Sequence, residues 1–164
     1  MKITCLIPIL TAALFTACAQ TLPTAATLTP QQLASECAAA LNAKDYSKAQ
    51  AMAKQATDSD AKFAEAWVAY GMASLRLGQT EQARASYERA LSLHQARHLQ
   101  NPSDANQVVQ QIFLLTLLGR QADAETLLKQ AHTDYPSDQT ITKFTEDFTT
   151  TKQGCQSWML EVKP

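Results

Sequence analysis

The sequence predicts an all-α protein built from stacked helix pairs. Its 164 residues include 28 alanines but only nine valines and isoleucines together. Alanine is the best helix former, whereas β-branched residues are typical of strands, so a large sheet is nearly excluded. Small and apolar residues also recur about every 34 residues, and this period is typical of helical repeats.

Charge and composition argue against several functions. The formal net charge of -1 and the pI of about 6.3 give no reason to expect a nucleic-acid surface. Four glycines, three histidines and four cysteines leave little material for a phosphate loop, a zinc site or a disulfide framework. The chain has no CxxC and no GxSxG motif, and no nucleophile has a base beside it in the pattern. We therefore predict a protein that is not an enzyme, with no catalytic residues, no metal, no cofactor and no small-molecule substrate.

An apolar run, residues 3–17, follows Lys2 near the N-terminus. One positive charge, a run of about 15 apolar residues and then small residues are the plan of a secretory signal. The run is shorter than the stretch of about 20 residues that spans a bilayer core. We therefore predict a signal peptide over residues 1–17 and export to the periplasm.

Two cleavage signals overlap where this run ends. Ala17, Cys18 and Ala19 fit the small-x-small rule of ordinary signal peptidase. Phe15 to Cys18 (FTAC) also resembles a bacterial lipobox, although that family usually has Leu in place of Phe15. The lipobox resemblance implies a lipid anchor on Cys18, and Ala19 after it implies the outer membrane. Cleavage to a soluble periplasmic protein is the alternative.

A flexible tether is expected over residues 18–29, because they are small, polar and contain proline. The first helix then begins with a capping signal. Thr29 can cap it, Pro30 suits its first turn, and Gln32 completes a capping box.

The body of the chain repeats itself. The segment KDYSKAQAMAKQATD from Lys44 aligns with GQTEQARASYERALS from Gly78 at an offset of 34 residues, and a third copy starts at Gly119. A helix–turn–helix period of 34 residues is that of the tetratricopeptide repeat, which this region resembles. The middle copy has the family's signature residues Trp67, Gly71, Gly78, Ala83, Tyr87 and Ala90.

The resemblance implies a right-handed superhelical solenoid over residues 30–136, with three helix pairs at about 30–60, 61–100 and 104–136. Gly71 would let paired helices approach each other closely. Gly78 and Gly119 would end the first helix of their pairs, where a positive φ is easiest for glycine. Lys44 replaces this glycine in the first copy. Tight helix contacts are expected at Ala83, Ala90, Ala124 and Ala131.

Individual helices are expected at about 30–42, 46–58, 61–77, 80–99, 104–118 and 121–134. The distance from Gly78 to Gly119 exceeds the repeat by about two helical turns, so the second helix of the middle pair should be longer. This extension includes His94 and His98. Because a zinc site needs three or four ligands, we expect both to be solvated histidines on a helix surface. Asp104 should cap the helix that follows.

A capping helix and a tail are predicted over residues 137–164. Asp138 can cap a helix whose Ile141, Phe144 and Phe148 share one face. Such a helix would cover the open apolar face of the last pair. The tail, CQSWMLEVKP from Cys155, is unusually apolar.

The resemblance also implies a partner-binding groove, because the first helix of each pair lines the concave side in this family. Some members clamp a peptide carboxylate there with polar residues, but this chain has Ala34, Ala38, Val68 and Met72 at the matching places. An apolar peptide or an amphipathic helix is therefore the expected ligand. The groove's predicted residues are Leu41, Asn42, Glu65, Val68, Met72, Leu75, Arg76, Val109, Phe113 and Leu117.

Cys37 and Cys155 remain after removal of the signal, and they would reside in an oxidising compartment. A disulfide between them would tie the tail to the first helix pair. Alternatively, Cys37 is a small buried residue and both thiols are free.

Taken together, these features predict a protein–protein interaction adaptor in the bacterial cell envelope. By analogy from the predicted fold and cellular location, the protein is expected to assist the assembly of a pilus, a secretion pore or an outer-membrane complex. The alternative is a structural envelope protein whose groove is filled by its own C-terminal tail.

Overall fold

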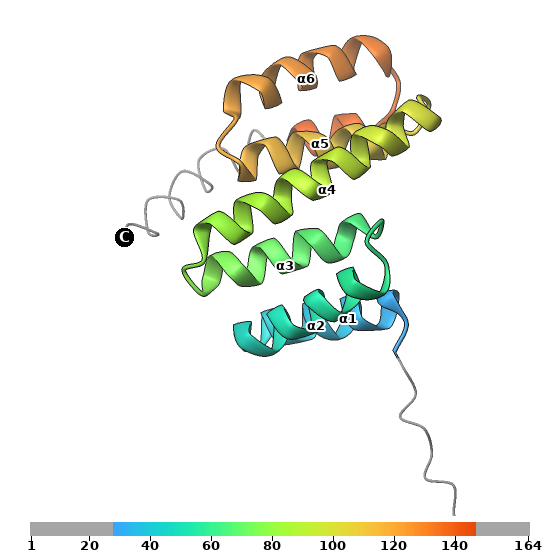
Figure 1. The fold of residues 1–164 in the computed structure, drawn as a ribbon. Coiled ribbons are helices and arrows are strands. Elements are labelled where there is room, and N and C mark those ends of the chain that lie inside the picture. Colours follow the sequence, from blue (N-terminus) through green and yellow to red (C-terminus); the bar gives the residue numbers. More distant parts are fainter. Residues whose placement is uncertain (1–27, 147–164) are drawn as a thin grey trace, which may run out of the picture.

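Six helices follow one another as antiparallel pairs, and a seventh begins at residue 139 (Figure 1). The computed structural model describes residues 28–146, and these contain no strand. The all-α solenoid with a C-terminal capping helix is thus confirmed. The helices are α1 (Pro30–Asn42), α2 (Tyr46–Ser59), α3 (Ala64–Arg76), α4 (Thr80–Gln100), α5 (Ala105–Leu117) and α6 (Gln121–Asp134).

Three of the six labelled helices begin at side chains that satisfy free backbone N–H groups. The Thr29 hydroxyl accepts from the N–H of Gln32, and the Gln32 side chain accepts from the N–H of Thr29, so the predicted capping box is present at α1. Asp45 caps α2, and Asp104 caps α5 as predicted. These residues set the bounds of α1, α2 and α5.

The start of α3 was predicted wrongly, since the helix begins at Ala64 and not at residue 61. Asp60 closes a turn before it, in which its carboxylate accepts from the N–H of Lys62. The Trp67 indole also donates to the carbonyl of Ala61 at 3.0 Å. Because these bonds hold residues 60–63 as a turn, the helix cannot extend further toward the N-terminus.

The turn inside each helix pair contains one residue with positive φ. Gly78 (φ 77°) and Gly119 (φ 73°) adopt the predicted left-handed conformation after α3 and α5. Lys44, the equivalent residue after α1, is also left-handed, at φ 59°. The first pair therefore makes the same turn without the glycine that suits it.

Alanines form much of the core, because they let the helices pack closely. Ala83, Ala90, Ala124 and Ala131 are buried, as predicted. The largest cluster lies among α4, α5, α6 and the start of the seventh helix, where Ile141 is buried. Ile112, Leu114 and Tyr87 fill the space between the alanines.

The second helix of the middle pair is longer, as predicted: α4 has 21 residues, whereas α2 and α6 have 14 each. The prediction that His94 is solvated was wrong, because it is only 2% exposed. Its Nδ1 lies 2.9 Å from Oε1 of Gln107, whose Nε2 donates to Asp104. His98 is partly buried. The extension therefore packs against the start of α5.

Neighbouring first helices are spaced unequally along the stack. α1 packs directly against α3, but no Cα atom of α3 lies within 8 Å of one in α5, although both helices are fully described. α4 packs on both α3 and α5 and lies between these two helices (Figure 1). The concave side is therefore wider between the second and third pairs.

The predicted C-terminal capping helix begins at residue 139. Asp138 caps it, because its carboxylate accepts from the N–H groups of Thr140 and Ile141. Phe144 packs against the main core cluster. Phe148, like the apolar run, Cys18, most of the tether and the tail, lies outside the described residues. Within residues 28–146, no helix has the length and hydropathy needed to cross a membrane.

Candidate partner-binding groove

Two large apolar side chains are exposed on the side of the stack predicted to bind a partner. Met72 on α3 is 41% exposed and Phe113 on α5 is 38% exposed. The two residues occupy equivalent positions in their helices, and Ala38 is the equivalent residue on α1. This row gives the groove adaptable apolar groups at its surface.

Below this row, the predicted groove residues are partly buried and form its floor. Val68 and Leu75 of α3 and Val109 and Leu117 of α5 all pack against the main core cluster. The structure thus packs four of the predicted residues against one core cluster. Leu41 packs against a separate cluster around Cys37, so the first helix pair contributes to a different part of the floor.

Polar residues lie at the two ends of α3. Glu65, in its first turn, forms an ion pair of 3.0 Å with Arg97 of the α4 extension. Arg97 also donates to the carbonyl of Lys62. Because Arg97 forms the ion pair, the carboxylate of Glu65 already has a partner within the protein. Arg76 is exposed at the opposite end of α3, and Asn42 is exposed at the end of α1.

A small pocket lies where α3 and α5 diverge. Its volume is about 70 Å³, which exceeds the roughly 15 Å³ that one buried water needs and is below the roughly 150 Å³ of a cavity that takes benzene. Two predicted groove residues line it, together with the start of α4. The lining residues are Leu75, Thr80, Ala83, Arg84, Tyr87, Leu117 and Leu118.

Sequence reasoning missed the polar groups of this pocket. Tyr87 is 2% exposed and its hydroxyl has no hydrogen-bond partner among the described residues. Burial raises the pKa of the Tyr87 phenol to about 12, against the opposing effect of the Arg76 charge. Arg84, one turn after Thr80, contributes a cation at the pocket. Arg84 comes from the second helix of the pair, whereas the predicted groove contained only first-helix residues.

Cys37 is fully buried between α1 and α2, and its thiol donates to the carbonyl of Ala49 at 3.2 Å. Burial raises the pKa of the thiol, so the reactive thiolate is disfavoured. Cys155 lies outside the described residues. The disulfide between the two cysteines therefore stays a prediction.

The predicted groove residues are mostly apolar. Among residues 28–146, no group of three or more His, Cys, Asp or Glu side chains could hold a metal ion. The groove offers apolar side chains, one buried hydroxyl and guanidinium groups, which suit noncovalent recognition of a chain segment.

The paired helices, their glycine turns and their buried alanines define a helical repeat protein. Residues 40–112 match the model of the tetratricopeptide repeat. No curated protein sequence matches the chain.

Solved structures with a similar arrangement of helices include a domain of Arabidopsis OM64, at 15% identity and a TM-score of 0.46, covering 76% of this chain and 97% of that one. The Sgt2 domain of Aspergillus fumigatus has 18% identity and a TM-score of 0.47, with 85% and 89% covered. The Yersinia enterocolitica secretion chaperone SycD, solved with a peptide of the translocator YopD, has 15% identity and a TM-score of 0.48, with 79% and 93% covered.

Proposed function

We propose that this protein is an interaction adaptor that binds an apolar peptide or an amphipathic helix in the groove between α3 and α5. The observation that carries the proposal is the pair of exposed side chains Met72 and Phe113 above an apolar floor. Exposed apolar surface costs free energy in water, and a partner's apolar side chains would remove it from water. No Cα atom of α3 lies within 8 Å of one in α5, and we place the partner's backbone along the row from Met72 to Phe113.

Capture of envelope proteins by the full chain tests this proposal. The double variant Met72→Asp and Phe113→Asp should lose the captured partner, because a charge in an apolar contact must be desolvated. Leu99→Asp is the matched control, since Leu99 is 80% exposed on α4 and lies outside the groove. Circular dichroism should show that both variants keep their helices. Unchanged capture by the folded double variant would exclude the groove.

The second candidate function is a structural envelope protein whose groove is filled by its own tail. The apolar tail sequence from Cys155 to Pro164 favours it. Deletion of residues 155–164 separates the two functions. An adaptor should stay folded and soluble after the deletion and capture its partner at least as well, whereas a self-filled groove should become exposed and the protein should aggregate.

We further propose that the protein acts in the bacterial cell envelope, exported by residues 1–17 and anchored to the outer membrane by a lipid on Cys18. The apolar run and the FTAC sequence support this location. Assembly of a pilus, a secretion pore or an outer-membrane complex would suit an anchored adaptor of this kind. Cells labelled with a radioactive lipid precursor should yield a labelled protein, and Cys18→Ala should abolish the label. A wild-type protein without label would exclude the lipid anchor.

A further inference from the structure

Three sulfur-containing side chains lie among the described residues, and they differ in their access to solvent. Met72 on α3 is 41% exposed, whereas Met52 on α2 is partly buried and packs against the core cluster around Cys37. Cys37 itself is 0% exposed. Because oxidation of sulfur follows its exposure, a dissolved oxidant reaches Met72 more readily than the other two residues.

Cys37 does not compete with Met72 for an oxidant in the folded protein. A peroxide reacts with the thiolate form of cysteine rather than with the thiol. The Cys37 thiol donates to the carbonyl of Ala49, and burial raises its pKa. Both effects keep the proton on the sulfur, so the thioether of Met72 is the accessible reducing group within residues 28–146.

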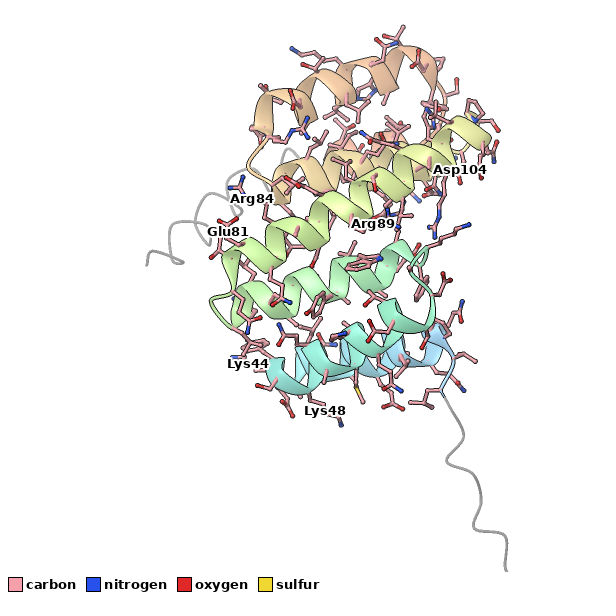
Figure 2. All side chains as sticks on the ribbon, viewed as in Figure 1. Lys44, Lys48, Glu81, Arg84, Arg89 and Asp104 are labelled. Atoms are coloured by element: carbon pink, nitrogen blue, oxygen red, sulfur yellow. The ribbon has the colours of Figure 1, made fainter. Side chains whose placement is uncertain are left out.

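Met72 also supplies much of the exposed apolar surface of the groove. Within residues 28–146, only Met72, Phe113 and Leu99 are large apolar side chains that are exposed, and Leu99 lies outside the groove on α4. The exposed positions of α4 include charged residues such as Arg84 and Arg89 (Figure 2). A polar group on Met72 would therefore alter one of the two large apolar side chains exposed in the groove.

We propose that Met72 is an oxidation site that switches the groove from apolar to polar. Hydrogen peroxide transfers one oxygen atom to the Met72 sulfur: an S–O bond forms, the O–O bond breaks, and the second oxygen leaves as water. The sulfoxide oxygen accepts hydrogen bonds, and a partner that buried it against apolar side chains would leave it without a donor. Oxidation therefore releases the apolar partner.

The switch is reversible, because two thiols reduce the sulfoxide to the thioether and are themselves oxidised to a disulfide, with release of water. Methionine sulfoxide reductases catalyse this step. This inference rests on the proposed function, because it names the regulation of the same groove.

Peptide mass mapping of the full chain after mild peroxide treatment tests the chemistry. Trypsin places Met52 in the peptide of residues 49–54 and Met72 in the peptide of residues 63–76, where fragment ions distinguish Met72 from Trp67. In the folded protein, Met72 should gain oxygen at least about five-fold faster than Met52. In urea the two rates should become equal, because both side chains are then exposed. Equal rates in the folded protein would overturn the inference, whatever the groove binds.

Capture of envelope proteins by treated and untreated protein then tests the switch. Peroxide-treated wild type should capture at least about five-fold less partner, and Met72→Gln, which copies the polarity of the sulfoxide, should do the same without peroxide. Methionine sulfoxide reductases should restore capture by the treated wild type. Met72→Leu has no sulfur at this position, so its capture should be the same before and after peroxide. Met52→Leu is the matched control and should stay as sensitive to peroxide as the wild type.

The outcomes separate this inference from the proposed function. If the Met72→Asp and Phe113→Asp double variant loses capture but wild type with oxidised Met72 keeps it, the groove binds a partner and the switch is wrong. A loss of capture after peroxide that persists in Met72→Leu, or a loss of helix content by circular dichroism, would also overturn the inference. Unchanged capture by the folded double variant would exclude the proposed function and the switch with it, even where Met72 oxidises rapidly.

Discussion

The ring of Tyr87 occupies the space that a side chain on Gly71 would need. A Cβ atom added to Gly71 would lie 2.4 Å from Cε1 of Tyr87 and 2.7 Å from its Cδ1. The absence of a side chain at Gly71 thus lets α4 place a buried aromatic ring directly against α3.

Gly71→Ala should therefore destabilise the protein by about 1–2 kcal/mol. Alanine would gain about 1 kcal/mol of helix propensity, but overlap with a buried ring costs about 1–3 kcal/mol and this ring has little room to move. Urea unfolding measures the change. In a double-mutant cycle, Tyr87→Leu should relieve most of the penalty. A stabilising Gly71→Ala would contradict the close contact.

Lys44→Gly should stabilise the protein by about 1 kcal/mol, because a non-glycine residue at positive φ carries a cost of roughly that size. The melting temperature should rise by about 4 °C for a domain of this length. Gly78→Ala provides the opposite change at the equivalent turn and should lower the melting temperature. If both variants shift it in the same direction, the left-handed turn does not determine stability there.

The protein should lose stability between about pH 10 and pH 12. In this window an unfolded tyrosine releases its proton, whereas the phenol of Tyr87 keeps it in the folded state because its pKa is raised to about 12. The unfolded state then binds fewer protons than the folded state, so the free energy of unfolding falls as pH rises, by at most about 2.7 kcal/mol. Urea unfolding at pH 9 and pH 11.5 measures this loss. Tyr87→Phe should reduce it, and equal losses in both proteins would argue against a protected phenol.

Gln107→Ala should cost about 1–3 kcal/mol, because it leaves Nδ1 of buried His94 without its partner. Gln110→Ala is the matched control, since Gln110 is exposed on the same helix. Its effect should stay within about 0.5 kcal/mol. Thermal unfolding of the two variants gives the comparison, and equal effects would show that the His94 hydrogen bond contributes nothing.

The thiol of Cys37 should react slowly with a thiol reagent in the native protein and rapidly in urea. Burial and the raised pKa both suppress the thiolate that reacts. Rapid native reaction would indicate that the first helix pair opens easily. Mass mapping without reductant would test the Cys37–Cys155 disulfide directly.

Local signals in the sequence predict the parts of the fold that depend on one or two nearby residues. Thr29 and Asp104 predict helix starts, because a short polar side chain can accept from the free N–H groups beside it. Gly78 and Gly119 predict the turns after α3 and α5, because few other residues adopt positive φ. The start of α3 could not be predicted in this way, since Phe63 precedes it and offers no cap.

The details of the groove depend on contacts between distant residues. Nothing near His94 in the sequence indicates burial, because its partner Gln107 lies in the next helix. The groove-facing offsets predict Leu75 and Leu117, but the pocket between them exists only because α3 and α5 separate over α4. The hydroxyl of Tyr87 has no hydrogen-bond partner among the described residues, and no sequence pattern reveals a missing contact.

The separation of α3 from α5 also bears on how the molecule comes apart. α4 is the only labelled helix that packs on both, so the last helix pair is joined to the rest largely through its contacts with α4. In a stack where each unit touches only its neighbours, opening can begin at the weakest junction. Under tension or mild denaturant, α5 and α6 can detach together as one cooperative segment while α1 to α4 stay assembled. A partner that binds both α3 and α5 would hold the two parts together and raise the free energy of unfolding of the whole stack.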